Sequence, residues 1–266
     1  MHTSVVIPLD GCENTRDLGG MVTADGRRIK TKRLLRSDKL SDLTEKDINL
    51  LSNEYSLKYI IDMRTAAEKQ MQPDKAVPGS ELIELPIFDE SVNGVTHEKR
   101  ASVVPVGKDM KNAVPSPDMM KNAYRRMVSE EYSMAQYRKF FELLLSNEEG
   151  SVLWHCAMGK DRAGMAAVLT LSALGVERES IIKDYLLTNE LCQNHISHIV
   201  SMVMKNVGDK IDEATCIRSF SACEDYLMCA LDIIDNTHGG MDAFLENKMG
   251  LTPALREKLK TMYLEA

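Results

Sequence analysis

Residues 151–174 read SVLWHCAMGKDRAGMAAVLTLSAL. The stretch begins with a short apolar segment typical of a buried strand. From Ala163 onward it is apolar on every side, as in a buried helix. Gly175 follows, at the position where helices commonly end in a left-handed residue. A strand that passes through a short loop directly into a helix indicates an α/β fold with a parallel sheet.

The loop between this strand and this helix has the properties of a phosphate cradle. Its backbone N–H groups curl toward one point, and the positive end of the helix dipole faces the same point. Arg162, at the start of the helix, carries a planar guanidinium that can bind two phosphate oxygens at once. We therefore predict phosphate binding by the whole loop, which consists of Ala157, Met158, Gly159, Lys160, Asp161 and Arg162.

Cys156 lies at the entrance to this loop and is the predicted nucleophile. The N–H groups, the helix dipole and Arg162 all favour the thiolate, which is the reactive form of cysteine. The competing interpretation is a buried core cysteine, a common role for this residue type. A core cysteine does not need the charged Gly-Lys-Asp-Arg run that follows, so catalysis is the better explanation.

The first half of the chain alternates short strands with helices. Leu57 to Ile61 and Leu82 to Phe88 are β-rich segments, and Thr44 is a good N-cap for the helix that precedes the first of them. Such alternation is typical of βαβ units in a parallel sheet.

The rest of the chain is predicted to be largely helical. Residues 88–117 form a long polar segment without periodicity, which is either a functional loop or a tolerated insertion. Residues 118–145 have a helical pattern, and helices dominate again after Asn189. We expect a single domain over residues 1–266.

Composition excludes several other classes of protein. The net charge of −7 argues against nucleic acid as a partner. The sequence has no signal-peptide pattern and no run of about 20 apolar residues that could span a membrane. Six irregularly spaced cysteines predict neither disulfides nor a structural zinc site. We therefore expect a cytoplasmic protein without metal or cofactor, although export without a leader stays open.

Four ordered motifs carry a resemblance to a known family. They are Asn14-Thr15-Arg16-Asp17-Leu18-Gly19-Gly20, Arg36-Ser37, Asp62-Met63-Arg64 with Glu68, and Asp184-Tyr185-Leu186 with Asn189. Together with the loop His155–Arg162, they make the sequence similar to the atypical bacterial tyrosine phosphatases, whose loop reads HCxxGKDRTG. Thr15, Met158 and Ala163 depart from the family pattern.

The resemblance implies a cysteine-phosphatase fold, with a mostly parallel central sheet flanked by helices. It also implies a helical lid from Asn189 to Ser221. Family members act on phosphotyrosine, with dual specificity in some, and on phosphoinositides. Lys160 suits such highly anionic substrates. Supporting roles fall to four residues near the loop, namely Arg16, Asp62, Arg64 and His155.

The general acid is less clearly marked than the nucleophile. Asp161 is the family's suggestion and our first choice, followed by Asp62 and Asp118. Each of these carboxylates could instead serve only to hold backbone or arginine groups in place.

Three functions are consistent with the sequence. The leading one is a phosphomonoester hydrolase acting through a phosphocysteine on Cys156. The alternative is a catalytically inactive module that binds phosphorylated ligands, but both Cys156 and Arg162 are retained. A sulfurtransferase or arsenate reductase ranks third, because those enzymes lack the Gly-Lys-Asp-Arg run. Phosphotyrosine, phosphoserine and phosphoinositide substrates all remain open at this point, as does the oligomeric state.

Overall fold

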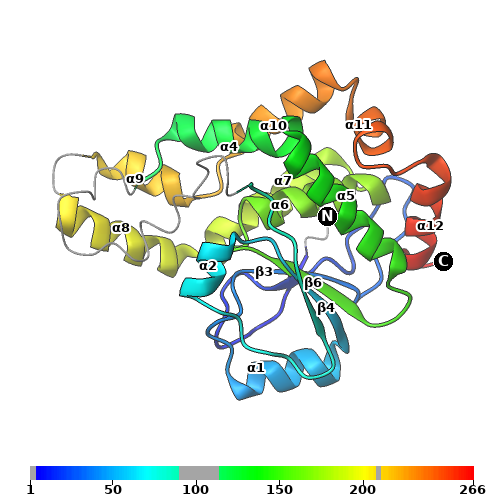
Figure 1. Ribbon diagram of the computed structural model, residues 1–266, viewed down its shortest axis with the longest axis horizontal. Coiled ribbons are helices and arrows are strands. Elements are labelled where there is room, and N and C mark those ends of the chain that lie inside the picture. The colour runs from blue at the N-terminus through cyan, green and yellow to red at the C-terminus, as the bar shows by residue number, and fades with distance from the viewer. Residues whose placement is uncertain (1–3, 90–113, 208–210) are drawn as a thin grey trace.

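The computed structural model describes residues 4–89, 114–207 and 211–266 (Figure 1). Within these residues the chain forms one sheet of strand order β1-β2-β3-β6-β4-β5. Strands β3, β6, β4 and β5 are parallel to one another. Strand β2 pairs antiparallel with both β1 and β3. The bounds are β1 (Val5–Val6), β2 (Arg16–Asp17), β3 (Leu34–Ser37), β4 (Leu57–Asp62), β5 (Glu81–Glu84) and β6 (Ser151–His155). The expected mostly parallel sheet is confirmed.

Alternating side chains of the central strands enter two separate cores. Leu34, Ile61 and Val152 belong to the larger cluster, while their neighbours Leu35, Ile60 and Leu153 belong to the smaller one. All six are at most 2% exposed. Because side chains alternate between the faces of a strand, burial of both sets shows that both faces of the sheet are covered.

Helices form the two covering layers (Figure 1). One face packs against α1 (Glu45–Asn49) and the π-helical turn η1 (Leu50–Glu54). The helices that contribute to the larger core are α4 (Pro117–Ser129), α5 (Glu131–Ser146), α6 (Arg162–Leu174), α7 (Arg178–Leu191), α10 (Glu224–Thr237), α11 (Met241–Asn247) and α12 (Pro253–Tyr263). The structure therefore has the predicted α/β architecture. In the part of the chain that the structure describes, no helix is both long and apolar enough to cross a membrane.

The predicted buried helix after the loop is confirmed. In α6, 12 of the 13 residues are buried. It ends at Gly175, which has φ of +92° and donates its N–H to carbonyls of the last helical turn. Thr44 caps α1 as expected, and Asp47 completes a reciprocal capping box.

The helical pattern of residues 118–145 is confirmed, and one strand boundary was wrong. The helical region is divided into α4 and α5, because Glu130 between them adopts an extended conformation. The predicted strand from Leu82 to Phe88 is only β5, since pairing with β4 ends at Glu84. Leu85 and Phe88 are nevertheless buried in the core. Most of the predicted 88–117 loop lies outside the described residues.

The segment proposed as a lid contains two helices at one end of the molecule (Figure 1). These are α8 (Gln193–Val207) and α9 (Glu213–Phe220). The two ends of the segment meet, because the Asn189 side chain exchanges two hydrogen bonds with the backbone of Ala222, of 2.7 and 2.8 Å.

Candidate active site

The motifs found in the sequence meet at one edge of the sheet. In the register of the sheet, Ser37 of β3 and Asp62 of β4 both pair with His155 of β6. The residues that follow these three positions therefore leave the carboxyl edge side by side. In open α/β sheets this edge is where ligands bind.

The conformation of the loop depends on Gly159. Its φ is +67°, and a Cβ at this position would lie 2.4 Å from the carbonyl oxygen of Ser37. Thr15, which departs from the family pattern, is buried, and its hydroxyl lies 2.6 Å from that of Ser37.

The carbonyl groups of the loop point outward to fixed partners. The oxygens of Ala157, Met158 and Gly159 accept hydrogen bonds of 3.2, 2.7 and 2.7 Å from Lys39, Asn14 and Arg36, respectively. Across a trans peptide the C=O and the following N–H point in opposite directions. The amides of residues 158–160 therefore face the inside of the loop, as an anion cradle requires.

Arg162 is held in place by a carboxylate from another helix. Its Nη1 and Nη2 each donate a 2.8 Å hydrogen bond to Glu68, which belongs to α2 (Ala66–Met71). Glu68 is itself fixed, because it accepts from both the backbone and the hydroxyl of Thr65. This two-pronged pair fixes the plane of the guanidinium at the start of α6.

Cys156 is a fully buried cysteine that directly follows β6. The start of α6 above it is anchored by two aromatic side chains. Trp154 donates its indole N–H to the carbonyl of Ala163 at 3.0 Å, and Tyr137 donates to the carbonyl of Arg162 at 3.1 Å. The strand that ends at the thiol and the helix that closes the loop are therefore joined directly.

Asp161 lies at the end of a chain of hydroxyl groups. Tyr124 of α4 donates a 2.7 Å hydrogen bond to Asp161, and the hydroxyls of Tyr124 and Tyr185 lie 2.6 Å apart. Burial, followed by the nearby Asp161 carboxylate, raises the pKa of both tyrosines well above the usual value. Both phenols are therefore protonated donors at neutral pH.

Two loop residues contact the segment with α8 and α9 instead of filling the cradle. Met158 packs into a cluster with apolar residues of these helices, among them Ile196, Val200 and Phe220. Lys160 is 1% exposed and donates to the carbonyls of Ser219 and Ser221 at 3.2 and 3.3 Å. The departure at Met158 thus makes an apolar contact between the loop and these helices.

A buried cluster of charges fixes the far side of the loop. Asp184 of α7 lies between Arg16, at 3.1 Å, and Arg36, at 2.8 Å. Burial opposes its ionisation, but the two arginines lower the pKa of Asp184 to about 2. Burial and the charge of Arg16 lower the pKa of Arg36 to about 10, so Arg36 remains a cation that grips the carbonyl of Gly159.

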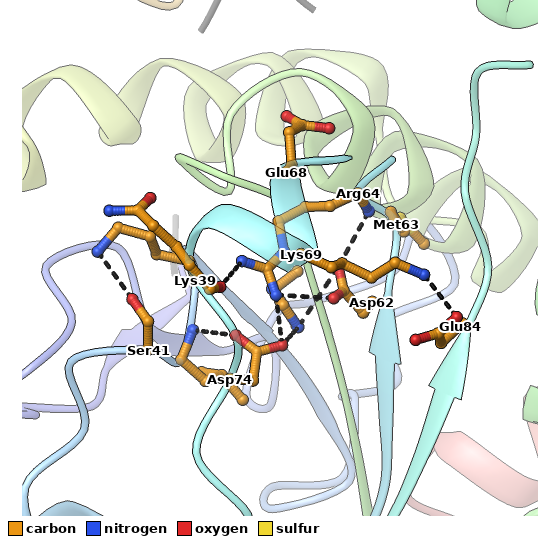
Figure 2. A network of polar contacts seen from close by, with 12 residues as sticks. Lys39, Ser41, Asp62, Met63, Arg64, Glu68, Lys69, Asp74 and Glu84 are labelled. Carbon is orange, nitrogen blue, oxygen red and sulfur yellow. Dashed lines mark hydrogen bonds and ion pairs between the residues drawn. The ribbon is translucent and has the colours of Figure 1, made fainter. Parts of the chain in front are cut away.

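A second buried cluster lies at the ends of β4 and β6. Figure 2 shows Arg64 between Asp62 and Asp74, with its Nη2 2.7 Å from an oxygen of each. The Nε2 of His155 lies 3.0 Å from Asp74 and 3.9 Å from Asp62. Three of these side chains, those of Asp62, Asp74 and His155, are close enough to suggest a cation site. The guanidinium of Arg64 already provides the positive charge there.

The candidate acids differ in their surroundings. Both oxygens of Asp62 accept hydrogen bonds from Arg64, of 2.9 and 2.7 Å, which fits the supporting role predicted for it. Asp118 is exposed in the first turn of α4. Asp161 alone of the three belongs to the loop.

Sequence reasoning missed several residues of the site. Asp184 and Arg36 were recognised only as parts of motifs, and Tyr124 and Asp74 were not singled out at all. Their partners are distant in sequence, so no local spacing marks them. Glu68 did carry a signal, since it lies at N3 of a helix after Thr65.

A buried cysteine below inward-facing amides and a fixed arginine is the arrangement of the cysteine-dependent phosphatases, and this enzyme is one of them. A family model described as "Tyrosine phosphatase family" matches residues 7–265. Since this match covers almost the whole chain, the protein belongs to the tyrosine phosphatase family.

Two relatives identified by sequence have names that agree with this assignment. A protein of Cupriavidus necator whose name assigns it to the tyrosine-protein phosphatases is 27% identical over 91% of this chain and 84% of its own length. The triple specificity protein phosphatase PtpB of Mycobacterium tuberculosis is 23% identical over 96% of this chain and 98% of its own. The catalytic core of Siw14 matches with a TM-score of 0.32 and 12% identity, over 86% of this chain and 95% of that one.

Proposed function

We propose that Cys156 attacks the phosphorus of a phosphate monoester held by residues 157–162. An S–P bond forms while the bond from phosphorus to the leaving oxygen breaks. Water then cleaves the S–P bond of the phosphocysteine, which releases inorganic phosphate and restores the thiolate. The observation that carries this proposal is the outward anchoring of three successive loop carbonyls, because it turns the amides between them toward the phosphate.

Arg162 and the loop amides have the same electrostatic task in both steps. They bind the equatorial oxygens of the phosphoryl group, whose charge must be stabilised as it transfers. Glu68 keeps the guanidinium oriented before substrate arrives, so little reorganisation is needed. In the first step Asp161 gives its proton to the leaving oxygen, and in the second it removes one from water.

Phosphorylated proteins are the proposed substrates, with phosphotyrosine first. Phosphoinositides are a second class, supported by the additional cation that Lys160 brings to the loop. The triple specificity in the name of the Mycobacterium tuberculosis relative is consistent with a site that accepts more than one kind of phosphate ester.

The segment from Asn189 to Ser221 is proposed to act as a lid within a single domain. Its described part is closed at the base by the Asn189–Ala222 pair, and it touches the loop through Met158 and Lys160. Opening requires that these last contacts break, together with the 2.6 Å hydrogen bond from the Ser219 hydroxyl to the carbonyl of Pro115. We also propose a cytoplasmic location, since none of the six cysteines forms a disulfide in the structure.

The proposed chemistry is tested with Cys156→Ser and a panel of phosphate esters. The variant is expected to lose essentially all turnover of p-nitrophenyl phosphate and still bind tungstate, because the cradle is unchanged. Comparison of kcat/KM for a phosphotyrosine peptide, a phosphoserine peptide and a soluble phosphoinositide then ranks the substrates.

Two results would contradict the proposal. Turnover by Cys156→Ser above a trace would exclude Cys156 as the nucleophile. A wild-type protein that binds tungstate but hydrolyses none of the esters would instead be an inactive binding module.

A further inference from the structure

Asp74 joins the ends of three parallel strands beneath the loop. Its Oδ1 accepts a 2.9 Å hydrogen bond from the backbone of Leu40, which follows β3. Its Oδ2 lies 2.7 Å from Arg64, which follows β4, and 3.0 Å from His155 of β6. The carboxylate side chain is only 3% exposed, so it is placed by packing as well as by these contacts.

The charges around Asp74 balance only if His155 is protonated. The buried groups that face the His155 ring are Asp62, Asp74 and Arg64, which together carry a net charge of −1. An uncompensated buried charge is costly, whereas an imidazolium brings the cluster to neutrality. Burial opposes protonation of His155, but the attraction of Asp62 and Asp74 prevails and raises its pKa.

The two ring nitrogens of His155 face acceptors on opposite sides. Nε2 faces the carboxylate of Asp74 at 3.0 Å, in a contact that is short but poorly aligned for a hydrogen bond. Coulomb attraction does not depend on that alignment. Nδ1 lies 3.3 Å from the carbonyl oxygen of Cys156. A neutral imidazole has one N–H group and can direct it at only one of these two acceptors. An imidazolium has an N–H group for each.

We propose that Asp74 is a positioning residue for the reaction of Cys156, which it supports by keeping His155 in the doubly protonated form. The imidazolium donates to the carbonyl of Cys156 and thereby places a cation next to the backbone of the nucleophile. A nearby cation favours the thiolate over the thiol. This inference rests on the proposed role of Cys156 and adds a carboxylate to which neither the motifs nor the family match gave a role.

The variant Asp74→Asn tests the proposal, because it keeps the shape of the side chain and removes its charge. We measure the pH at which alkylation of Cys156 by iodoacetamide reaches half its maximal rate. In Asp74→Asn this pH should be higher than in the wild type by about one unit, which is the size of pKa shift that one neighbouring charge can cause. Below that pH, kcat should fall about tenfold, in proportion to the thiolate fraction. KM should change little, since the cradle is intact.

Asp47→Asn is the matched control. Asp47 is also a buried carboxylate, but its partners lie around α1, away from the loop. It accepts hydrogen bonds of 2.8 Å from the backbone of Asp10 and Thr44 and of 2.9 Å from Gly11. Its loss should lower the melting temperature and leave the pH profile of alkylation unchanged. The same behaviour in Asp74→Asn would show that Asp74 has a structural role only and would overturn the proposal.

A measurement on the wild-type protein keeps the proposal falsifiable if Asp74→Asn folds poorly, and a double variant tests it further if Asp74→Asn folds. In wild-type protein labelled with ¹⁵N-histidine, the resonances lost in His155→Gln identify the His155 ring, and both nitrogens should be protonated at pH 7. A neutral ring would overturn the proposal. In addition, Asp74→Asn should have no further effect on the alkylation profile when combined with His155→Gln. Turnover by Cys156→Ser would refute the proposed function, in which Cys156 is the nucleophile. The protonation of His155 would still be tested, because the ¹⁵N measurement does not depend on activity.

Discussion

Asp161 has a position in the site that suits both a proton donor and a fixed structural group. Its carboxylate accepts from Tyr124 and lies 3.7 Å from the ammonium of Lys160. Both contacts would suit a carboxylate that only holds the loop together. Asp161 also belongs to the loop that would hold the phosphate, as a proton donor to the leaving oxygen must.

The variant Asp161→Asn separates the two roles by the leaving group of the substrate. For phenyl phosphate, whose leaving oxygen needs a proton, we expect kcat/KM to fall by about a hundredfold or more. For a dinitrophenyl phosphate, whose anion leaves readily, the loss should be only a few-fold. The two esters can be compared in the same spectrophotometric assay.

Asp118→Asn is the control, because this exposed carboxylate lies outside the loop. It should leave both rates unchanged. Equal losses on the two esters in Asp161→Asn would mean that Asp161 holds the loop together and that the proton comes from elsewhere.

At the scale of elements, the C-terminal end of α9 points its carbonyls at the phosphate loop. The last carbonyls of a helix have no partner within it and carry partial negative charge. Lys160 satisfies two carbonyls there, those of Ser219 and Ser221. The same ammonium cannot bind a second phosphate of the substrate while it holds α9. Binding of a second phosphate would therefore require α9 to release Lys160.

Lys160→Met should loosen α9 while it preserves the length of the side chain. Each hydrogen bond from a charged donor contributes about 1.5–3 kcal/mol. We therefore expect amide exchange over residues 213–221 to accelerate by at least about tenfold. Hydrogen–deuterium exchange with mass spectrometry measures this directly.

Lys205→Met, which changes an exposed lysine of α8, is the matched control and should leave exchange in α9 unchanged. If Lys160→Met also leaves it unchanged, the packing of Met158 and Phe220 is sufficient to hold the helix, and the lysine does not act as a latch.

At the scale of the whole molecule, Asp184 connects the beginning of the chain to the helical half. From its place on α7, Asp184 contacts Arg16 of β2, Arg36 of β3 and the hydroxyl of Ser4. Removal of one member of a buried ion pair leaves the others uncompensated, at a cost of about 3–5 kcal/mol. The free energy of unfolding of Asp184→Asn should fall by that amount, measured by urea titration.

Asp235→Asn provides the comparison, since Asp235 pairs with Arg178 at the surface, where such pairs contribute about 0–1 kcal/mol. The effect of Asp184 should also depend on pH. Its pKa is lowered to about 2, so its stabilisation is complete above the ordinary value of about 3.9 and is lost as the pH falls through 2. The difference between wild type and Asp184→Asn should therefore disappear in strong acid. A difference that persists there would exclude ion pairing as its source.

Local patterns predicted the central part of this structure well. The strand, the loop and α6 follow from hydrophobic periodicity within residues 151–174, and the capping residue Thr44 marks the start of α1. The break at Glu130 could not be predicted, because the surrounding sequence contains neither glycine nor proline and keeps its helical pattern.

The polar partners of the site were also beyond local prediction. Tyr124 and Asp74 come from segments distant from residues 151–162, and only the packing of the whole chain brings them to the loop. The spacing of residues along the sequence does not predict such contacts between distant segments.

Trp154 has a consequence for how the intact enzyme can be observed. It is the chain's single tryptophan, it is fully buried, and it lies two positions before Cys156. Its ring meets Phe140 edge-on at 5.3 Å, and its N–H is bound to the first turn of α6. Intrinsic fluorescence excited at the red edge of protein absorption therefore originates from one known point beside the nucleophile. A rearrangement of the loop that moves α6 relative to Trp154 should therefore change this emission, so the loop can be followed without a dye or a mutation.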